Sequence, residues 1–323
     1  MILQAIKKYK IDLVDVAFDD ALAAGFVDKL QKYGVTAFGP TKKAAQLEWS
    51  KEWSRNFMQK YKLPIPEFHT FTNTRDAIQF INKGHERLLF IKASGLALGK
   101  GVIKAETKEQ AKDAILAMSQ FGKSGETFLI EEGLQGEEFT FFAICDGVGY
   151  QIAKSSQDHK TIFNGDKGPN TGGVGCVSPT GALSKNLITD IEKKIIQPTL
   201  SGMQKEGRPY TGILYIGGMV TKQGIKIIEF NARWGDPEAE VILPGLQTDY
   251  LDLVQKTLRG NIKNTQISFD KKIRVSITGC ANGYPTDYTD VKGKEIFGIP
   301  EVTKLPYIQL FGSGIKRDGK HLS

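Results

Sequence analysis

Residues 227–238 read Ile-Ile-Glu-Phe-Asn-Ala-Arg-Trp-Gly-Asp-Pro-Glu. Apolar residues alternate around Glu229, which predicts a β-strand. Glu229 and Asn231 are two positions apart, so a strand places both side chains on one face. Two oxygen donors on one face suit a hard cation such as Mg²⁺, and Arg233 just beyond can bind a phosphate or a carboxylate. The alternative interpretation is an exposed strand end with ordinary salt bridges.

The composition is that of a globular protein. The chain has 323 residues, of which 40% are hydrophobic, and this length predicts two to three domains. It contains no run of 18 apolar residues, and the N-terminus lacks the apolar core of a secretory signal. Three scattered cysteines indicate neither a zinc site nor a disulfide framework. We therefore expect a cytoplasmic protein without a membrane anchor.

The net charge of +7 permits a nucleic-acid partner. Lysine and arginine are nevertheless spread along the chain, without an aromatic-basic RNA motif or zinc-finger spacing. A basic protein also attracts anionic small substrates. We therefore expect small-molecule substrates, with no nucleic acid and no membrane as partners. We also expect a monomer.

Hydrophobic periodicity divides the chain into three parts. Residues 1–45 contain a strand, a helix over 20–33 and a second strand, which form a partial parallel β-α-β unit. Residues 52–259 form the central domain, whose smaller α+β lid spans about 66–130. Residues 265–323 begin a partial β-rich module. A helix is expected over 42–61 and another over 184–206, whereas residues 155–179 show no regular period and are expected to form a long functional loop.

Three further segments carry candidate chemistry. Lys92 ends an apolar strand and precedes a loop, Ser94 to Gly101, whose three glycines allow backbone N–H groups to approach a polyphosphate. The sequence 128–134 runs from an apolar strand into two carboxylates, which suits a nucleoside. Residues 157–175 combine Asp158, a histidine and a lysine with a glycine-rich stretch that suits a small substrate. Taken singly, these segments are also compatible with a hairpin turn, a solvated acidic turn and a structural histidine.

Together these segments resemble the ATP-grasp superfamily and, within it, the glycinamide ribonucleotide synthetases. The resemblance covers nearly all of residues 11–312. It rests on Phe38-Gly-Pro-Thr41, Ala44-Ala-Gln-Leu-Glu48, Lys92-Ala-Ser-Gly-Leu-Ala-Leu-Gly-Lys-Gly101, Gln157-Asp-His-Lys160, Gly168-Pro-Asn-Thr-Gly-Gly173, Tyr210-Thr-Gly-Ile-Leu-Tyr215, Glu229-Phe-Asn-Ala-Arg-Trp-Gly-Asp-Pro-Glu238, and Gly283-Tyr-Pro285 with Asp287-Tyr288.

The resemblance implies an ATP-grasp fold, in which two α+β subdomains grip ATP, and it implies a role for each matching residue. Glu229 and Asn231 would bind Mg²⁺ or Mn²⁺. The ATP contacts would be Lys51, Lys92, Gly95, Gly99, Lys100, Gly101, Glu131, Glu132, Leu134 and Glu137. The catalytic residues would be Arg233, Asp236, Asp158 and Lys160. The remaining substrate contacts would be His159, Pro169, Asn170, Thr171, Gly172 and Gly173.

The implied reaction joins glycine to 5-phosphoribosylamine at the expense of ATP, through an acyl phosphate, in de novo purine biosynthesis. A ligase of the same superfamily for another carboxylate is the nearest alternative. This sequence departs from the family pattern at Val16-Ala-Phe-Asp19, where the family has Val-Gly-Pro-Glu, and at Leu98, where it has alanine. The family's glycine-rich N-terminal motif and the end of its C-terminal module are not found. We therefore expect a fragment that binds ATP, with weak or no ligase turnover.

Overall fold

The computed structural model describes residues 2–84, 87–97, 101–165, 167–319 and 321–322. Its centre is a six-stranded sheet in the order β11-β10-β7-β8-β9-β12, in which every neighbouring pair is antiparallel. The strands of this sheet are Gly224–Asn231 (β11), Thr211–Thr221 (β10), Glu137–Asp146 (β7), Tyr150–Phe163 (β8), Lys167–Ser178 (β9) and Arg274–Ile277 (β12).

Strand β7 shows why this sheet is the core of the molecule. Phe139 and Phe141 pack into one hydrophobic cluster, whereas Phe142 and Ile144 pack into another. Successive side chains of a strand point to opposite faces, so β7 is buried on both sides from Phe139 to Cys145, where every residue except Thr140 is apolar. Helices cover the first face of the sheet at Lys51–Lys60 (α5), Lys185–Ile191 (α8) and Gln197–Lys205 (α9), and the second at Glu238–Ile242 (α10) and Tyr250–Leu258 (α11).

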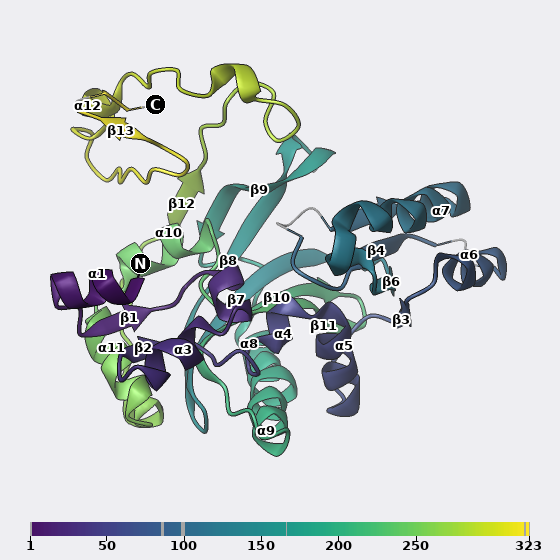
Figure 1. Ribbon diagram of the computed structural model, residues 1–323, viewed down its shortest axis with the longest axis horizontal. Coiled ribbons are helices and arrows are strands. Elements are labelled where there is room, and N and C mark those ends of the chain that lie inside the picture. Colours follow the sequence, from purple (N-terminus) through teal and green to yellow (C-terminus); the bar gives the residue numbers. More distant parts are fainter. Residues whose placement is uncertain (1, 85–86, 98–100, 166, 320, 323) are drawn as a thin grey trace.

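The lid is a separate four-stranded antiparallel sheet in the order β3-β6-β4-β5. Two helices pack against this sheet and enclose their own hydrophobic cluster (Figure 1). Asn73 and Thr107 cap these helices through their side-chain oxygens. The lid elements are Phe68–Phe71 (β3), Thr74–Asn82 (α6), Leu89–Ala93 (β4), Val102–Ala105 (β5), Lys108–Ala117 (α7) and Phe128–Glu132 (β6).

The N-terminal part contains the expected parallel pair, formed by Leu13–Asp15 (β1) and Thr36–Phe38 (β2). The single helix expected over 20–33 is wrong. Gly25 has a left-handed backbone (φ +72°) and separates two short helices. The helices of this part are Ile2–Tyr9 (α1), Asp19–Ala23 (α2) and Phe26–Lys32 (α3).

The helix expected over 42–61 is also divided. Residues Gln46–Trp49 form α4, and α5 begins anew at Lys51. Ser50 has an extended backbone, and its hydroxyl accepts a hydrogen bond from the amide of Trp53, so it caps α5. The helix expected over 184–206 is continuous but contains a π-helical segment, Glu192–Ile196, between α8 and α9.

The long loop expected over 155–179 is wrong, because these residues form most of β8 and β9. The two strands pair along the arm from Gln157 to Phe163, with register shifts near His159 and Thr161 (Figure 1). The pairing depends on backbone hydrogen bonds. The side chains are mostly polar or glycine and show no apolar alternation, so periodicity could not predict the strands.

The C-terminal part adds β12 to the edge of the large sheet and is otherwise largely exposed. Val275 and Ile277 of β12, and Ile273 just before it, occupy alternate positions and are all more than 60% exposed. Beyond β12, the described residues form a 3-10 turn at Thr289–Val291, a short helix, Ile299–Val302 (α12), and a pair of two-residue strands, Arg317–Asp318 (β13) and His321–Leu322 (β14). Among the helices of the described residues, none has the length and hydrophobicity of a membrane-spanning segment.

Candidate active site

Three lysines from different elements surround the carboxylate of Glu229 on β11. Lys51 begins α5, Lys92 lies on β4 and Lys160 lies on β8. The Lys160 ammonium lies 3.9 Å from Oε1 of Glu229. Burial raises the pKa of Glu229, but the charges of Lys160, Lys51 and Lys92 outweigh this effect and lower it below its ordinary value. The fold therefore brings together four predicted ligand-binding side chains that lie up to 178 positions apart in the sequence.

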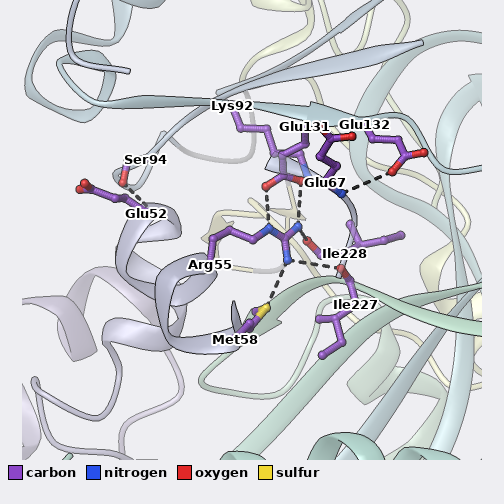
Figure 2. Close-up of polar contacts among 10 residues, drawn as sticks. All are labelled: Glu52, Arg55, Met58, Glu67, Lys92, Ser94, Glu131, Glu132, Ile227 and Ile228. Carbon is purple, nitrogen blue, oxygen red and sulfur yellow. Dashed lines mark hydrogen bonds and ion pairs between the residues drawn. The ribbon is translucent and has the colours of Figure 1, made fainter. Parts of the chain in front are cut away.

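A buried charge cluster holds Lys92 (Figure 2). Its ammonium lies 2.7 Å from Oε2 of Glu131, which also pairs with Arg55. Burial alone would raise the pKa of Glu131, but the two cations lower it to about 2. Glu131 was expected to contact the nucleoside. Its carboxylate is 2% exposed and is bound to Lys92 and Arg55, and the contact with the nucleoside stays a prediction.

The glycine loop after β4 is held close to its neighbours. A Cβ atom on Gly95 would lie 2.9 Å from Cα of Ser124, and one on Gly101 would lie 2.7 Å from Cβ of Ala97. Larger residues at these two positions would therefore displace the loop. Two expected phosphate contacts, Gly99 and Lys100, and the family departure at Leu98 lie outside the described residues.

The expected nucleoside contacts lie where β6 passes into β7. Glu132 is 39% exposed and its Oε2 accepts a hydrogen bond from the amide of Glu67. Leu134 is half-buried in the connection, and Glu137 is exposed at the start of β7. These three residues form the segment that joins the lid to the large sheet, which is compatible with a nucleoside held between the two subdomains.

Asp158 and Lys160 line one pocket with Glu138, Thr140 and Glu229. Burial and the nearby Glu238 carboxylate raise the pKa of Asp158 to about 7, although Lys160 opposes this shift. Among the described residues, no hydrogen-bond partner reaches the buried Oδ1 of Asp158. The pocket therefore contains a carboxylate suited to bind a cationic amine or to take a proton from it.

The other expected substrate contacts are only partly brought to this pocket. His159 alternates with Asp158 and Lys160 along β8 and is exposed, so it lies on the opposite face of the strand. Pro169 and Asn170 are exposed near the end of the arm. Three residues closer to the core are fixed by contacts: the Thr171 hydroxyl donates to the carbonyl of Lys160, the Gly172 amide donates to the hydroxyl of Tyr284, and a Cβ atom on Gly173 would meet the Pro237 ring.

Arg233 is held by Glu48, which lies at the end of α4. The Arg233 Nη2 atom lies 3.1 Å from Glu48 Oε1, while Glu48 Oε2 accepts from the amide of Ala232. Burial lowers the pKa of Arg233, but Glu48 and Asp19 outweigh it and raise the pKa above its ordinary value. The guanidinium is therefore a permanent cation at the edge of the site. Asp236, three residues further, is exposed.

Glu229 and Asn231 fit a hard cation by the chemistry of their donor atoms. Both donors are oxygens on one edge strand, and Nδ2 of Asn231 donates to the carbonyl of Phe230, which leaves Oδ1 as the acceptor. In the part of the chain that the structure describes, no three His, Cys, Asp or Glu side chains form a metal-binding group. Mg²⁺ usually keeps several waters and binds through one or two carboxylates together with substrate phosphates, which is compatible with Glu229 and Asn231 as its protein ligands.

Sequence reasoning missed three buried charged residues of this site. They are Arg55, Glu48 and Glu238, which are between 2% and 8% exposed. A signal existed for Arg55, because it follows Lys51 by four positions and therefore shares its helix face. Glu238 ends the motif of residues 227–238, and its Oε1 accepts from the hydroxyl of Thr140.

Two family models match this chain. The model described as phosphoribosylglycinamide synthetase, N domain, matches residues 1–48, and that described as the ATP-grasp (A) domain of the same synthetase matches residues 49–239. The trifunctional purine biosynthetic protein adenosine-3 of Bos taurus is 44% identical over 322 residues, which cover 98% of this chain and 32% of that protein. The phosphoribosylamine–glycine ligase of Streptococcus pneumoniae is 45% identical over 273 residues, covering 84% of this chain and 64% of the ligase.

Solved structures agree with these relatives. The crystal structure of phosphoribosylamine–glycine ligase from Thermotoga maritima matches with a TM-score of 0.76 and 32% identity, and the match covers 89% of this chain and 71% of that one. Biotin carboxylase from Campylobacter jejuni shares the fold at 18% identity, with a TM-score of 0.66 over 85% of this chain and 60% of that one. The chain spans between about one-third and two-thirds of the length of the two curated relatives above. It has the ATP-grasp fold and belongs to the phosphoribosylglycinamide synthetase family.

Proposed function

We propose that this chain is an ATP-dependent ligase that joins glycine to 5-phosphoribosylamine and forms glycinamide ribonucleotide, ADP and phosphate. The observation that carries the proposal is the convergence of Lys51, Lys92 and Lys160 on Glu229. Three cations beside a hard-metal ligand suit the triphosphate of ATP. The match of residues 49–239 to the ATP-grasp domain of the synthetase family supports the substrate assignment.

The first chemical step would place the carboxylate of glycine against the γ-phosphorus of ATP. A carboxylate oxygen forms the new bond to phosphorus as the bond to ADP breaks, giving glycyl phosphate. Lys51, Lys92 and Lys160 would spread the charge of the transferring phosphoryl group and orient it. Mg²⁺ or Mn²⁺, held by Glu229 and Asn231, would supply further charge neutralisation when bound.

The second step would join the amine of 5-phosphoribosylamine to the acyl carbon, with phosphate as the leaving group. The attacking amine loses a proton, and Asp158, whose pKa is raised to about 7, is suited to accept it. Arg233, held by Glu48, would bind an anionic group of a substrate or of the intermediate. Thr171, Gly172 and Gly173 would contribute backbone contacts to the same substrates.

The direct test is phosphate release from MgATP in the presence of glycine, with and without 5-phosphoribosylamine. Release that requires both substrates, together with formation of glycinamide ribonucleotide, supports the proposal. Release with a different carboxylate but not with glycine would assign the chain to another ligase of the superfamily. We further propose that the protein acts in the cytoplasm, which cell fractionation would test, and as a monomer, which size-exclusion chromatography would test.

A second candidate function is binding of MgATP without complete ligase turnover. It is favoured by the segment Val16–Asp19, which departs from the Val-Gly-Pro-Glu pattern and in which Phe18 is 62% exposed. Calorimetric binding of MgATP without any phosphate release in the presence of both substrates would select this candidate.

A further inference from the structure

Arg55 is a charged side chain of the candidate site whose guanidinium nitrogens all have partners within the protein. It lies on α5, one turn after Lys51, and is 3% exposed. Its Nε donates to Glu131 Oε1 at 2.7 Å, and its Nη2 donates to Glu131 Oε2 at 2.8 Å and to the carbonyl of Ile228 at 2.6 Å (Figure 2). Its Nη1 contacts the carbonyl of Ile227 and the sulfur of Met58. These contacts match the five N–H donors of a guanidinium.

The contacts of Arg55 join the two subdomains. Glu131 lies on β6 of the lid, whereas Ile227 and Ile228 lie on β11 of the large sheet. The two carbonyls immediately precede Glu229, the proposed metal ligand. The lid carboxylate in turn holds the ammonium of Lys92 at 2.7 Å. The Arg55 guanidinium is therefore hydrogen-bonded both to β11, which carries the proposed metal ligand Glu229, and to Glu131. Glu131 in turn holds Lys92, the proposed phosphate-binding lysine.

A lysine in place of Arg55 could not make the same set of contacts. A lysine at position 55 would keep the positive charge but would have three donors on one atom. It could not bind both oxygens of Glu131 and both carbonyls of β11 together. The Glu131 carboxylate would then be free to rotate, and Lys92 would lose its fixed orientation relative to Glu229.

We propose that Arg55 is a positioning residue that sets the Lys92 ammonium against the Glu229 carboxylate across the junction of lid and large sheet. This inference rests on the proposed nucleotide site, because it assigns Arg55 an effect on MgATP that acts through Lys92. Arg55 itself lies beneath the site and does not touch the substrate. Its function requires the bidentate shape of the guanidinium as well as its charge.

A double-mutant cycle tests the proposal. MgATP affinity is measured by calorimetry for the unmodified chain, Arg55→Lys, Lys92→Met and the double variant, and thermal unfolding without ligand is measured in parallel. Arg274→Lys is the matched control, since Arg274 makes a bidentate pair with Asp270 away from the nucleotide site. Loss of one charge-assisted contact to phosphate weakens binding roughly 10- to 100-fold, which is the range expected for Lys92→Met.

Arg55→Lys is expected to weaken MgATP binding about 10-fold, and to have less than a twofold effect once Lys92 is already methionine. Arg274→Lys should change affinity less than twofold. The positioning role is overturned if the loss of MgATP affinity in the double variant equals the product of the two single losses. It is also overturned if Arg55→Lys binds MgATP normally. In both cases the proposed function stands. If the unmodified chain binds no MgATP, both are overturned.

A second variant covers the case in which Arg55→Lys does not fold. Glu131→Asp keeps the charge but withdraws the carboxylate from Lys92 and Arg55 by one methylene. It is combined with Lys92→Met in the same cycle. An effect of Glu131→Asp on MgATP affinity that disappears in the Lys92→Met background supports the chain of contacts from Arg55 through Glu131 to Lys92. An effect that persists there overturns it.

Discussion

Two carboxylates of this site, Glu131 at the junction of lid and large sheet and Asp158 on the β8–β9 arm, are both poorly exposed but have opposite electrostatics. Glu131 has Arg55 and Lys92 as partners, and its pKa is lowered to about 2. Asp158 has Lys160 nearby but also faces Glu238, and its pKa is raised to about 7. The first carboxylate has its cations already bound within the protein, whereas the second lacks a full counter-charge. A carboxylate whose charge is neutralised by bound cations is suited to position other groups. A carboxylate without a full counter-charge is suited to bind a cation or a proton.

The largest expected effect is the loss of stability on replacement of Glu131. Glu131→Gln leaves Arg55 and Lys92 buried without an anion, so the free energy of unfolding should fall by about 3–5 kcal/mol. Chemical denaturation at neutral pH measures this change. Glu206→Gln is the control, because Glu206 also bridges two donors, Lys60 and Tyr61, but at a more exposed place. Equal losses for the two variants would show that burial of the Glu131 cluster is not what stabilises it.

The second-largest effect is expected for Glu229, whose carboxylate interacts with Lys92, the partner of Glu131, and with Lys160, the neighbour of Asp158. Glu229→Ala removes the proposed anionic metal ligand and should reduce nucleotide-dependent phosphate release at least ~10²-fold, as for other positioned electrostatic groups. Glu106→Ala, which removes an exposed carboxylate on the far edge of the lid, should leave the rate within about twofold. Unchanged metal-dependent binding of ATP to Glu229→Ala would show that Glu229 is not a metal ligand.

The raised pKa of Asp158 predicts a pH dependence of stability. The folded protein keeps the proton on Asp158 up to about pH 7, whereas the unfolded chain loses it near the ordinary value of 3.8. The folded state therefore binds more protons between these values, and this contribution to stability falls as the pH rises from about 4 to about 7. The slope is at most about 1.4 kcal/mol per pH unit for one group.

Asp158→Asn should remove that part of the slope. Unfolding free energies of both proteins, measured without ligand at several pH values between 4 and 7, test it. The two curves should diverge as the pH rises, with the asparagine variant the more stable at pH 7. Parallel curves would mean that Asp158 titrates normally and that the contrast with Glu131 does not hold.

The smallest effect is expected at His159, which shares the arm with Asp158 but lies on its other face. His159→Ala should change MgATP affinity and phosphate release by less than about twofold, in the range of surface substitutions. Lys160→Met, one residue further and on the pocket face, is the matched comparison and should reduce activity at least 10-fold. A loss of activity in His159→Ala comparable to that in Lys160→Met would show that His159 belongs to the substrate site.

The sequence alone predicted those features that depend on local periodicity. The alternation around Glu229 predicted β11 and the common face of Glu229 and Asn231, and the apolar strand ending at Lys92 predicted β4. These predictions succeed because the spacing of apolar residues along the sequence indicates which side chains are buried. The specific motifs likewise indicated the ATP-grasp fold, which the structure and the solved relatives confirm.

Only the tertiary structure decided how the charged groups are used. The sequence does not show that Arg55 and Glu48 are buried. Packing of the lid on the large sheet buries Arg55 beside Glu131, and packing of α4 on β11 buries Glu48 beside Arg233. The β8–β9 arm escaped prediction because its strands are held by backbone hydrogen bonds, which every sequence can make. Electrostatic fields depend on distances between elements, so the opposite pKa shifts of Glu131 and Asp158 exist only once the chain is folded.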